Sequence, residues 1–177
     1  MIAQLLLTVL PLVPNGAANP CEPLPSALRE YIHQALPEYE PASSQDFDSS
    51  WISEKSPEDQ TDGAPGCITG DFDGNGQRDF ALVLRHEGAV VIMAFRRVGT
   101  SYRHSLAFSR TDIPDKRPLH LALFRTPPGE IHGGGFGNSP PQHFKNQNPG
   151  IAIVFFETSS VYLYWAKGRW HEIWTSD

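Results

Sequence analysis

The chain has 177 residues, of which 40% are hydrophobic and 19% charged, so its length and composition fit one globular domain with a full core. The formal net charge of −6 and the pI near 5.6 argue against a general nucleic-acid binder, because such proteins need a basic surface. The 16 prolines and 15 glycines favour many short elements over long helices.

Residues 1–18 are typical of an export signal. Ile2 to Val13 form an apolar core, and small residues at 16–18 suit cleavage, although no Lys or Arg precedes the apolar run. The run is too short to cross a bilayer as a helix. The sequence therefore predicts a signal peptide over 1–18, a single globular domain over 19–177, and a periplasmic or secreted protein without a membrane span. The alternative is an N-terminal tail on a cytosolic protein.

Two cysteines, Cys21 and Cys67, are present. In an exported protein two cysteines most simply pair, so we predict a disulfide that ties the N-terminal region to a strand at 67–70. If the protein is not exported, the alternative is two unrelated thiols.

One helix is predicted over 23–36, because apolar residues recur at every fourth position and Pro37 ends the pattern. The repeating residues are Leu24, Leu28, Ile32 and Leu36. We expect this helix to place its apolar face on a sheet. A polar, irregular arm is predicted over 38–65, with Phe47, Trp51 and Ile52 as apolar anchors.

The rest of the chain is predicted to be rich in strands. The runs lie at 67–70, 80–85, 89–96, 102–108, 119–123, 151–156, 161–165 and 169–174. The runs at 80–85 and 89–96 are apolar at nearly every position, which is typical of strands covered on both faces. We predict an α+β fold, a mainly antiparallel sheet of about seven strands with one N-terminal helix. The alternative is an all-β sandwich or barrel.

A long loop rich in glycine and proline is predicted over 125–150. A loop of this length without secondary structure in a compact domain is either functional or mobile.

The most informative stretch is GDFDGNGQRDF, residues 70–80. Oxygen-bearing side chains alternate at Asp71, Asp73 and Asn75, and Asp79 follows. This pattern suits Ca²⁺, which takes six to eight oxygen ligands in a tight loop. An EF-hand is excluded, because Leu82 occupies the position of its last ligand and a strand pattern follows. The alternative is an Asx-rich turn that holds no ion.

The stretch GDFDGNGQRDFALVL resembles the calcium loops of FG-GAP and VCBS repeats, the type found in integrin alpha-subunit propeller blades. The resemblance implies that the side chains of Asp71, Asp73, Asn75 and Asp79 and the carbonyl of Gln77 are the ligands. The motif occurs once, so a propeller is not expected. The strand-rich region also resembles a group of short exported bacterial proteins without an established activity, which pair one such loop with a C-terminal segment like FFETSSVYLYWAKGRWHEIWTSD.

These observations predict an extracytoplasmic protein with one structural Ca²⁺ loop and no catalysis of its own. Its partner would be a protein or a cell-wall carbohydrate, bound through exposed aromatic residues such as Tyr162 and Tyr164.

Two alternatives involve residues 130–150. One is a secreted hydrolase, in which His132, His143 or Glu157 converge with other polar groups in a deep pocket. The segment His132-Gly133-Gly134-Gly135 resembles an esterase oxyanion segment, but the sequence contains no G-x-S-x-G nucleophile elbow. The other alternative is an inhibitor that presents this loop to a secreted hydrolase.

Overall fold

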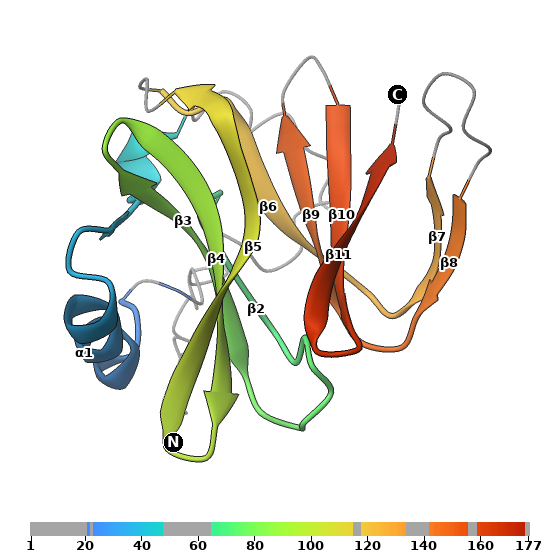
Figure 1. Cartoon of the computed structure of the whole chain (residues 1–177), viewed down its shortest axis with the longest axis horizontal. Coiled ribbons are helices and arrows are strands. Elements are labelled where there is room, and N and C mark those ends of the chain that lie inside the picture. Colours follow the sequence, from blue (N-terminus) through green and yellow to red (C-terminus); the bar gives the residue numbers. More distant parts are fainter. Residues whose placement is uncertain are drawn as a thin grey trace, which may run out of the picture.

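The structure is a computed structural model that describes residues 21, 23–47, 65–114, 118–133, 142–155 and 159–175. Within these residues the chain forms eleven β-strands, one α-helix and one 3-10 helix, and the strands make two larger sheets and a hairpin (Figure 1). The predicted mainly antiparallel architecture with one N-terminal α-helix is confirmed. The predicted single sheet of about seven strands is wrong, because eleven strands divide among two larger sheets and a hairpin, and the predicted α+β class is matched only loosely.

The first sheet has the order β1-β3-β4-β5, with β2 also paired to β3. The strands are β1 (Glu40–Pro41), β2 (Cys67–Gly70), β3 (Asp79–His86), β4 (Ala89–Val98) and β5 (Ser101–Pro114). β2 pairs with the first half of β3 and β1 with its end, so the two short strands follow one another along the same edge. Glu87 and Gly88 connect β3 to β4, and both have positive φ, as a two-residue type I′ turn requires.

The second sheet has the order β11-β10-β9-β6. Its strands are β6 (Leu121–Thr126), β9 (Gly150–Phe155), β10 (Ser159–Ala166) and β11 (Arg169–Thr175). Lys167 and Gly168 form the predicted two-residue turn between β10 and β11, again with positive φ at both positions.

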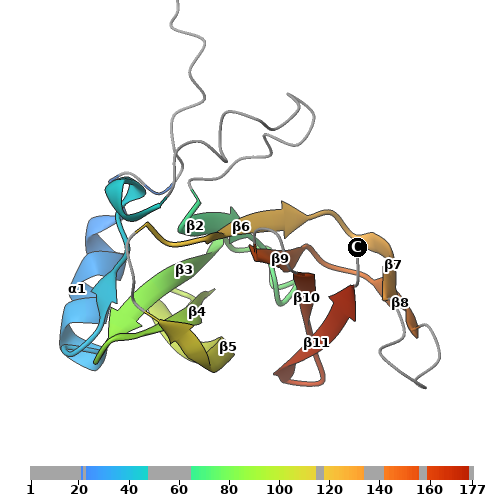
Figure 2. The same cartoon turned by 90° about the horizontal axis from the view of Figure 1, so that it is seen from above.

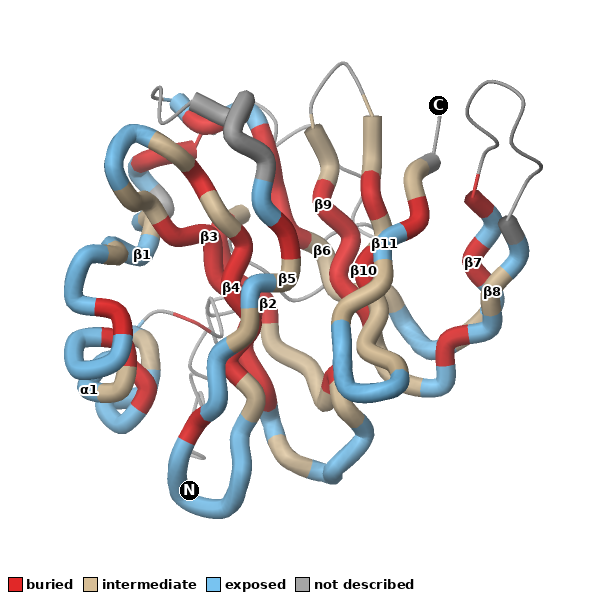
Figure 3. Tube along the Cα trace, viewed as in Figure 1, coloured by how far each residue is buried: buried red, intermediate tan, exposed pale blue. Residues whose placement is uncertain are grey.

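Buried segments run along the strands of both sheets (Figure 3), and the main apolar core combines side chains from the two sheets. Alternate residues of each strand face it, because side chains of a strand point to opposite faces in turn. The predicted alternation of Leu119, Leu121 and Leu123 is confirmed, since all three belong to this core. They pack with Ile68, Val83, Ile92, Phe108, Ile151, Ile153, Val161 and Leu163. The two sheets therefore form a sandwich.

The helix α1 (Ser26–Ala35) covers the outer face of the first sheet (Figure 2). Leu28 and Ile32 are buried against Phe80, Leu82 and Leu84, the alternate set of β3 side chains. The prediction that strand 80–85 is covered on both faces is thus confirmed. Among the described residues, no helix has the length and apolar character needed to cross a membrane.

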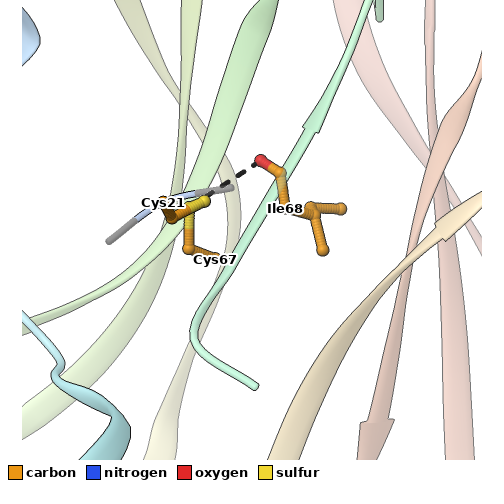
Figure 4. The surroundings of a disulfide bond; sticks show 3 residues. All are labelled: Cys21, Cys67 and Ile68. Carbon is orange, nitrogen blue, oxygen red and sulfur yellow. Dashed lines mark hydrogen bonds between the residues drawn. A yellow bond between two sulfur atoms is a disulfide. The ribbon is translucent and has the colours of Figure 1, made fainter. Parts of the chain in front are cut away.

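The predicted disulfide is present between Cys21 and Cys67, whose Cα atoms lie 6.1 Å apart. Cys67 begins β2 and faces the helix-side cluster, whereas the next residue, Ile68, faces the core between the sheets (Figure 4). The bond therefore ties the segment before α1 to the strand that leads into Asp71.

Residues 125–150 are not the loop without secondary structure that the sequence predicts. They contain the end of β6, the antiparallel hairpin of β7 (Gly129–Gly133) and β8 (Gln142–Asn146), and the start of β9. The apolar signal is weak here because only Ile131 of β7 and Phe144 of β8 are large and apolar. Phe144 stacks on Tyr164 of β10, with ring centroids 3.7 Å apart, which attaches the hairpin to the second sheet.

The arm predicted over 38–65 is also more ordered than expected in its first part. It contains β1 and a 3-10 helix, η1 (Ser44–Asp46), and Phe47 is buried and bridges to Leu119. Phe47 is therefore the predicted anchor. Trp51 and Ile52, like the signal peptide predicted over 1–18, lie outside the described residues.

Candidate metal centre

The loop between β2 and β3 brings the predicted acidic ligands together. Gly70 ends β2 and Asp79 begins β3, and these two residues are cross-strand partners. The pairing closes the loop, so Asp71 and Asp79 return to the same place although they are eight positions apart in sequence.

Hydrogen bonds within the loop shape it around its acidic side chains. Asp71 accepts the backbone N–H of Asn75 on Oδ1 at 2.9 Å and that of Gly76 on Oδ2 at 2.8 Å. Asn75 Oδ1 accepts the N–H of Gln77 at 2.8 Å. Gly74 has positive φ, and a Cβ at this position would lie 2.8 Å from the side chain of Asn148. The positive φ favours glycine at 74, whereas the end of the Asn148 side chain could move aside for a Cβ.

Three carboxylates converge in this loop. One oxygen from each of Asp71, Asp73 and Asp79 lies within 4.8 Å of the other two. Two oxygens bound to one Ca²⁺ at 2.3–2.6 Å can be at most about 5 Å apart, so this spacing fits a shared ion. Asn75 and Gln77, which the resemblance also implies as ligands, lie in the same loop and stay predicted ligands.

Asp79 is the most unusual acid of the three, because it is 0% exposed. Its Oδ2 accepts the N–H of Phe72 at 3.0 Å, and its Oδ1 accepts that of Arg97 at 2.8 Å. The pKa of Asp79 is raised from 3.8 to about 6, chiefly by burial; the nearby charges of Asp73 and Asp71 add to the rise, and the two backbone hydrogen bonds oppose it. A bound divalent cation would supply the charge that the ionised group needs.

The raised pKa of Asp79 predicts how stability depends on pH without Ca²⁺. The folded state holds this proton up to about pH 6, whereas the unfolded state releases it near 3.8. The unfolding free energy should therefore fall between pH 4 and 7, by about 3 kcal/mol from this group. Urea denaturation with a chelator across this range measures the slope. Asp79→Asn is the control. It should remove this pH dependence, whether or not it also changes the unfolding free energy by an amount that is the same at every pH.

A basic residue from β4 adjoins the acidic cluster. Arg96 Nη1 lies 3.5 Å from Asp73 Oδ2, and its guanidinium carbon lies 3.8 Å from the ring centroid of Trp165. Arg96 thus places a positive charge beside one of the candidate ligands, and this charge would repel a metal cation that binds there. Sequence reasoning missed Arg96, Trp165 and Asn148, because only the fold brings them to the loop.

The other predicted site residues divide between three places. His132 and His143 meet on the β7–β8 hairpin, where both are exposed rather than in a deep pocket. Glu157 lies outside the described residues. Tyr162 and Tyr164 are half-buried, and the ring of Tyr164 stacks with Phe144 and His171, so this tyrosine packs the hairpin onto the sheet.

Comparisons with known proteins find no match. No protein-family model matches the chain, and no curated protein or solved structure is found to be similar to it. The likeness of the loop to FG-GAP and VCBS repeats therefore stays a prediction from the residues at 70–84.

Proposed function

We propose that this protein is an extracytoplasmic calcium-binding domain whose ion holds the loop between β2 and β3. The observation that carries the proposal is the convergence of Asp71, Asp73 and Asp79, within 4.8 Å of one another, at a loop closed by strand pairing. The oxygen-only character of this group favours a hard cation such as Ca²⁺ over a transition metal. The resemblance to an FG-GAP or VCBS loop supports the same ion.

The proposed role of the ion is structural. The loop joins two paired strands, and Asp79 and Asn75 also contact the backbone of Arg97 on β4. A cation bound there would neutralise the repulsion among three carboxylates that the pairing of β2 and β3 forces together. We propose a non-catalytic binding protein built on this stabilised sandwich, with a protein or a cell-wall carbohydrate as its partner. The Cys21–Cys67 disulfide supports an oxidising location outside the cytoplasm.

Calorimetric titration with Ca²⁺ tests the metal site. We expect one ion per chain with a Kd of about 10⁻⁴ to 10⁻³ M, the range of extracellular calcium modules. Asp71→Ala combined with Asp73→Ala should abolish the binding heat. The proposal is wrong if the unmodified protein gives no binding heat at millimolar Ca²⁺.

A variant that should bind Ca²⁺ more tightly gives a second test of the metal site. Arg96→Gln removes the positive charge that lies 3.5 Å from Asp73 Oδ2, so the affinity for Ca²⁺ should rise by about fivefold. Arg29→Gln, which changes an exposed arginine on α1, is the matched control and should leave the affinity unchanged. An affinity that falls in Arg96→Gln would show that Arg96 organises the loop instead of competing with the ion.

A further inference from the structure

The β7–β8 hairpin carries a pair of histidines that belongs to no site described above. His132 and His143 are directly opposite each other in the antiparallel register. Their Nδ1 atoms are 2.8 Å apart and share a hydrogen bond, in which one ring donates and the other accepts, and both side chains are exposed to solvent. Opposite residues of a strand pair are held at a fixed separation by the ladder, so the two imidazoles are already positioned without an added ligand.

The separation of the two nitrogens matches neighbouring positions around a tetragonal metal ion. Two metal–nitrogen bonds of about 2.0–2.1 Å at a right angle place the nitrogens about 2.9 Å apart, whereas a tetrahedral angle requires about 3.4 Å. The hydrogen bond already holds the two nitrogens 2.8 Å apart, so a metal ion bound to both would replace the shared proton with little movement of the rings. Tetragonal coordination by nitrogen is the preference of Cu²⁺ and Ni²⁺.

The surroundings of His132 favour the tautomer that a ligand needs. Glu130 lies two residues earlier on the same face of β7, and its Oε2 is 4.0 Å from His132 Nε2. At this distance no hydrogen bond forms, but the carboxylate attracts a proton on Nε2 and so favours Nδ1 as the metal ligand. Lys145, the cross-strand partner of Glu130, balances its charge, so binding here would depend on nitrogen coordination and not on a negative surface.

We propose that His132 and His143 bind a divalent transition-metal ion through their Nδ1 atoms, with Cu²⁺ bound more tightly than Ni²⁺ or Zn²⁺. The order follows the general affinity order of these ions for nitrogen ligands. The site is independent of the Asp71 loop, which offers only oxygen. Two protein ligands leave further coordination positions for water or for a group supplied by a partner.

The test is a Cu²⁺ titration of the whole protein in millimolar Ca²⁺, with the affinity measured against a competing chelator. Paramagnetic resonance of the bound Cu²⁺ should show coupling to two nitrogens. His132→Ala and His143→Ala should each weaken binding by at least tenfold, and Glu130→Gln by a smaller factor. His33→Ala, which changes an exposed histidine on α1, is the matched control and should bind as the unmodified protein does.

Three results would overturn the proposal. One is unchanged affinity in both His132→Ala and His143→Ala, and another is a spectrum without two nitrogen ligands. The third is loss of Cu²⁺ binding in Asp71→Ala plus Asp73→Ala, which would assign the ion to the acidic loop. If an alanine variant misfolds by circular dichroism, His132→Gln and His143→Gln give the same test with side chains of similar length.

Discussion

Phe72→Ala should lower the unfolding free energy by about 3–5 kcal/mol and also weaken Ca²⁺ binding. Phe72 stands between the candidate ligands Asp71 and Asp73, yet it is 0% exposed. It belongs to the core between the sheets, where its ring and that of Trp170 form a T-shaped pair with centroids 5.9 Å apart. The loss of this ring would leave a cavity in the core and release the loop from it.

The effect on the ion follows from the backbone of the same residue. The N–H of Phe72 donates to Asp79 Oδ2 at 3.0 Å, so the anchored ring holds the loop at the correct distance from the buried carboxylate. The ring also fills the space next to Gly70, where a Cβ would lie 2.7 Å from it. Loss of the ring should therefore make both the donor, the N–H of Phe72, and the acceptor, Asp79 Oδ2, less firmly positioned.

Urea denaturation with and without Ca²⁺ measures both parts of the expectation. Phe72→Leu is the matched control, because it keeps most of the buried volume and should cost less than the alanine change in both measurements. A Phe72→Ala protein that loses stability but binds Ca²⁺ with unchanged affinity would show that the loop holds its shape without the core.

The metal loop shows how far local sequence goes. The alternation of Asp71, Asp73 and Asn75 is a local pattern, and the structure brings Asp71 and Asp73 together with Asp79 as that pattern predicts. The pattern carries no information about residues that are distant in the sequence but close to the loop in the fold. Arg96 and Asn148 reach the loop only because β4 pairs with β3 and the turn after β8 folds back, and such contacts leave no spacing signal in the sequence.

The fold was predictable to a similar degree. Strands with continuous or alternating apolar residues, such as 80–85 and 119–123, were found because burial determines their sequence directly. The β7–β8 hairpin was missed because each of its strands has only one large apolar residue, Ile131 or Phe144, and only Ile131 is buried. The short β1 was missed for a related reason. It is only two residues long and exposed, and it is held by pairing with β3 rather than by burial.

Loss of the disulfide should be the other change with a large effect. Cys21→Ser combined with Cys67→Ser should lower the unfolding free energy by about 4 kcal/mol, because the bond closes a long loop in the unfolded chain. The two cysteines are 46 residues apart, and both are buried in the cluster beneath α1. Urea denaturation of the variant beside the oxidised protein measures the difference, and reduction of the unmodified protein should reproduce it.

The affinity for Ca²⁺ distinguishes two roles of the disulfide: restricting the unfolded chain, or holding β2 in position in the folded protein. In the chain-entropy account the disulfide restricts the unfolded state, so the folded double-serine variant should bind Ca²⁺ with the same Kd as the oxidised protein. This expectation is reasonable because β2 stays paired to β3 from Cys67 to Gly70, which holds the upstream end of the loop without the bond. A Kd that is tenfold higher in the folded variant would instead show that the bond to Cys21 holds β2 in place. In that case the disulfide would help to position the metal loop.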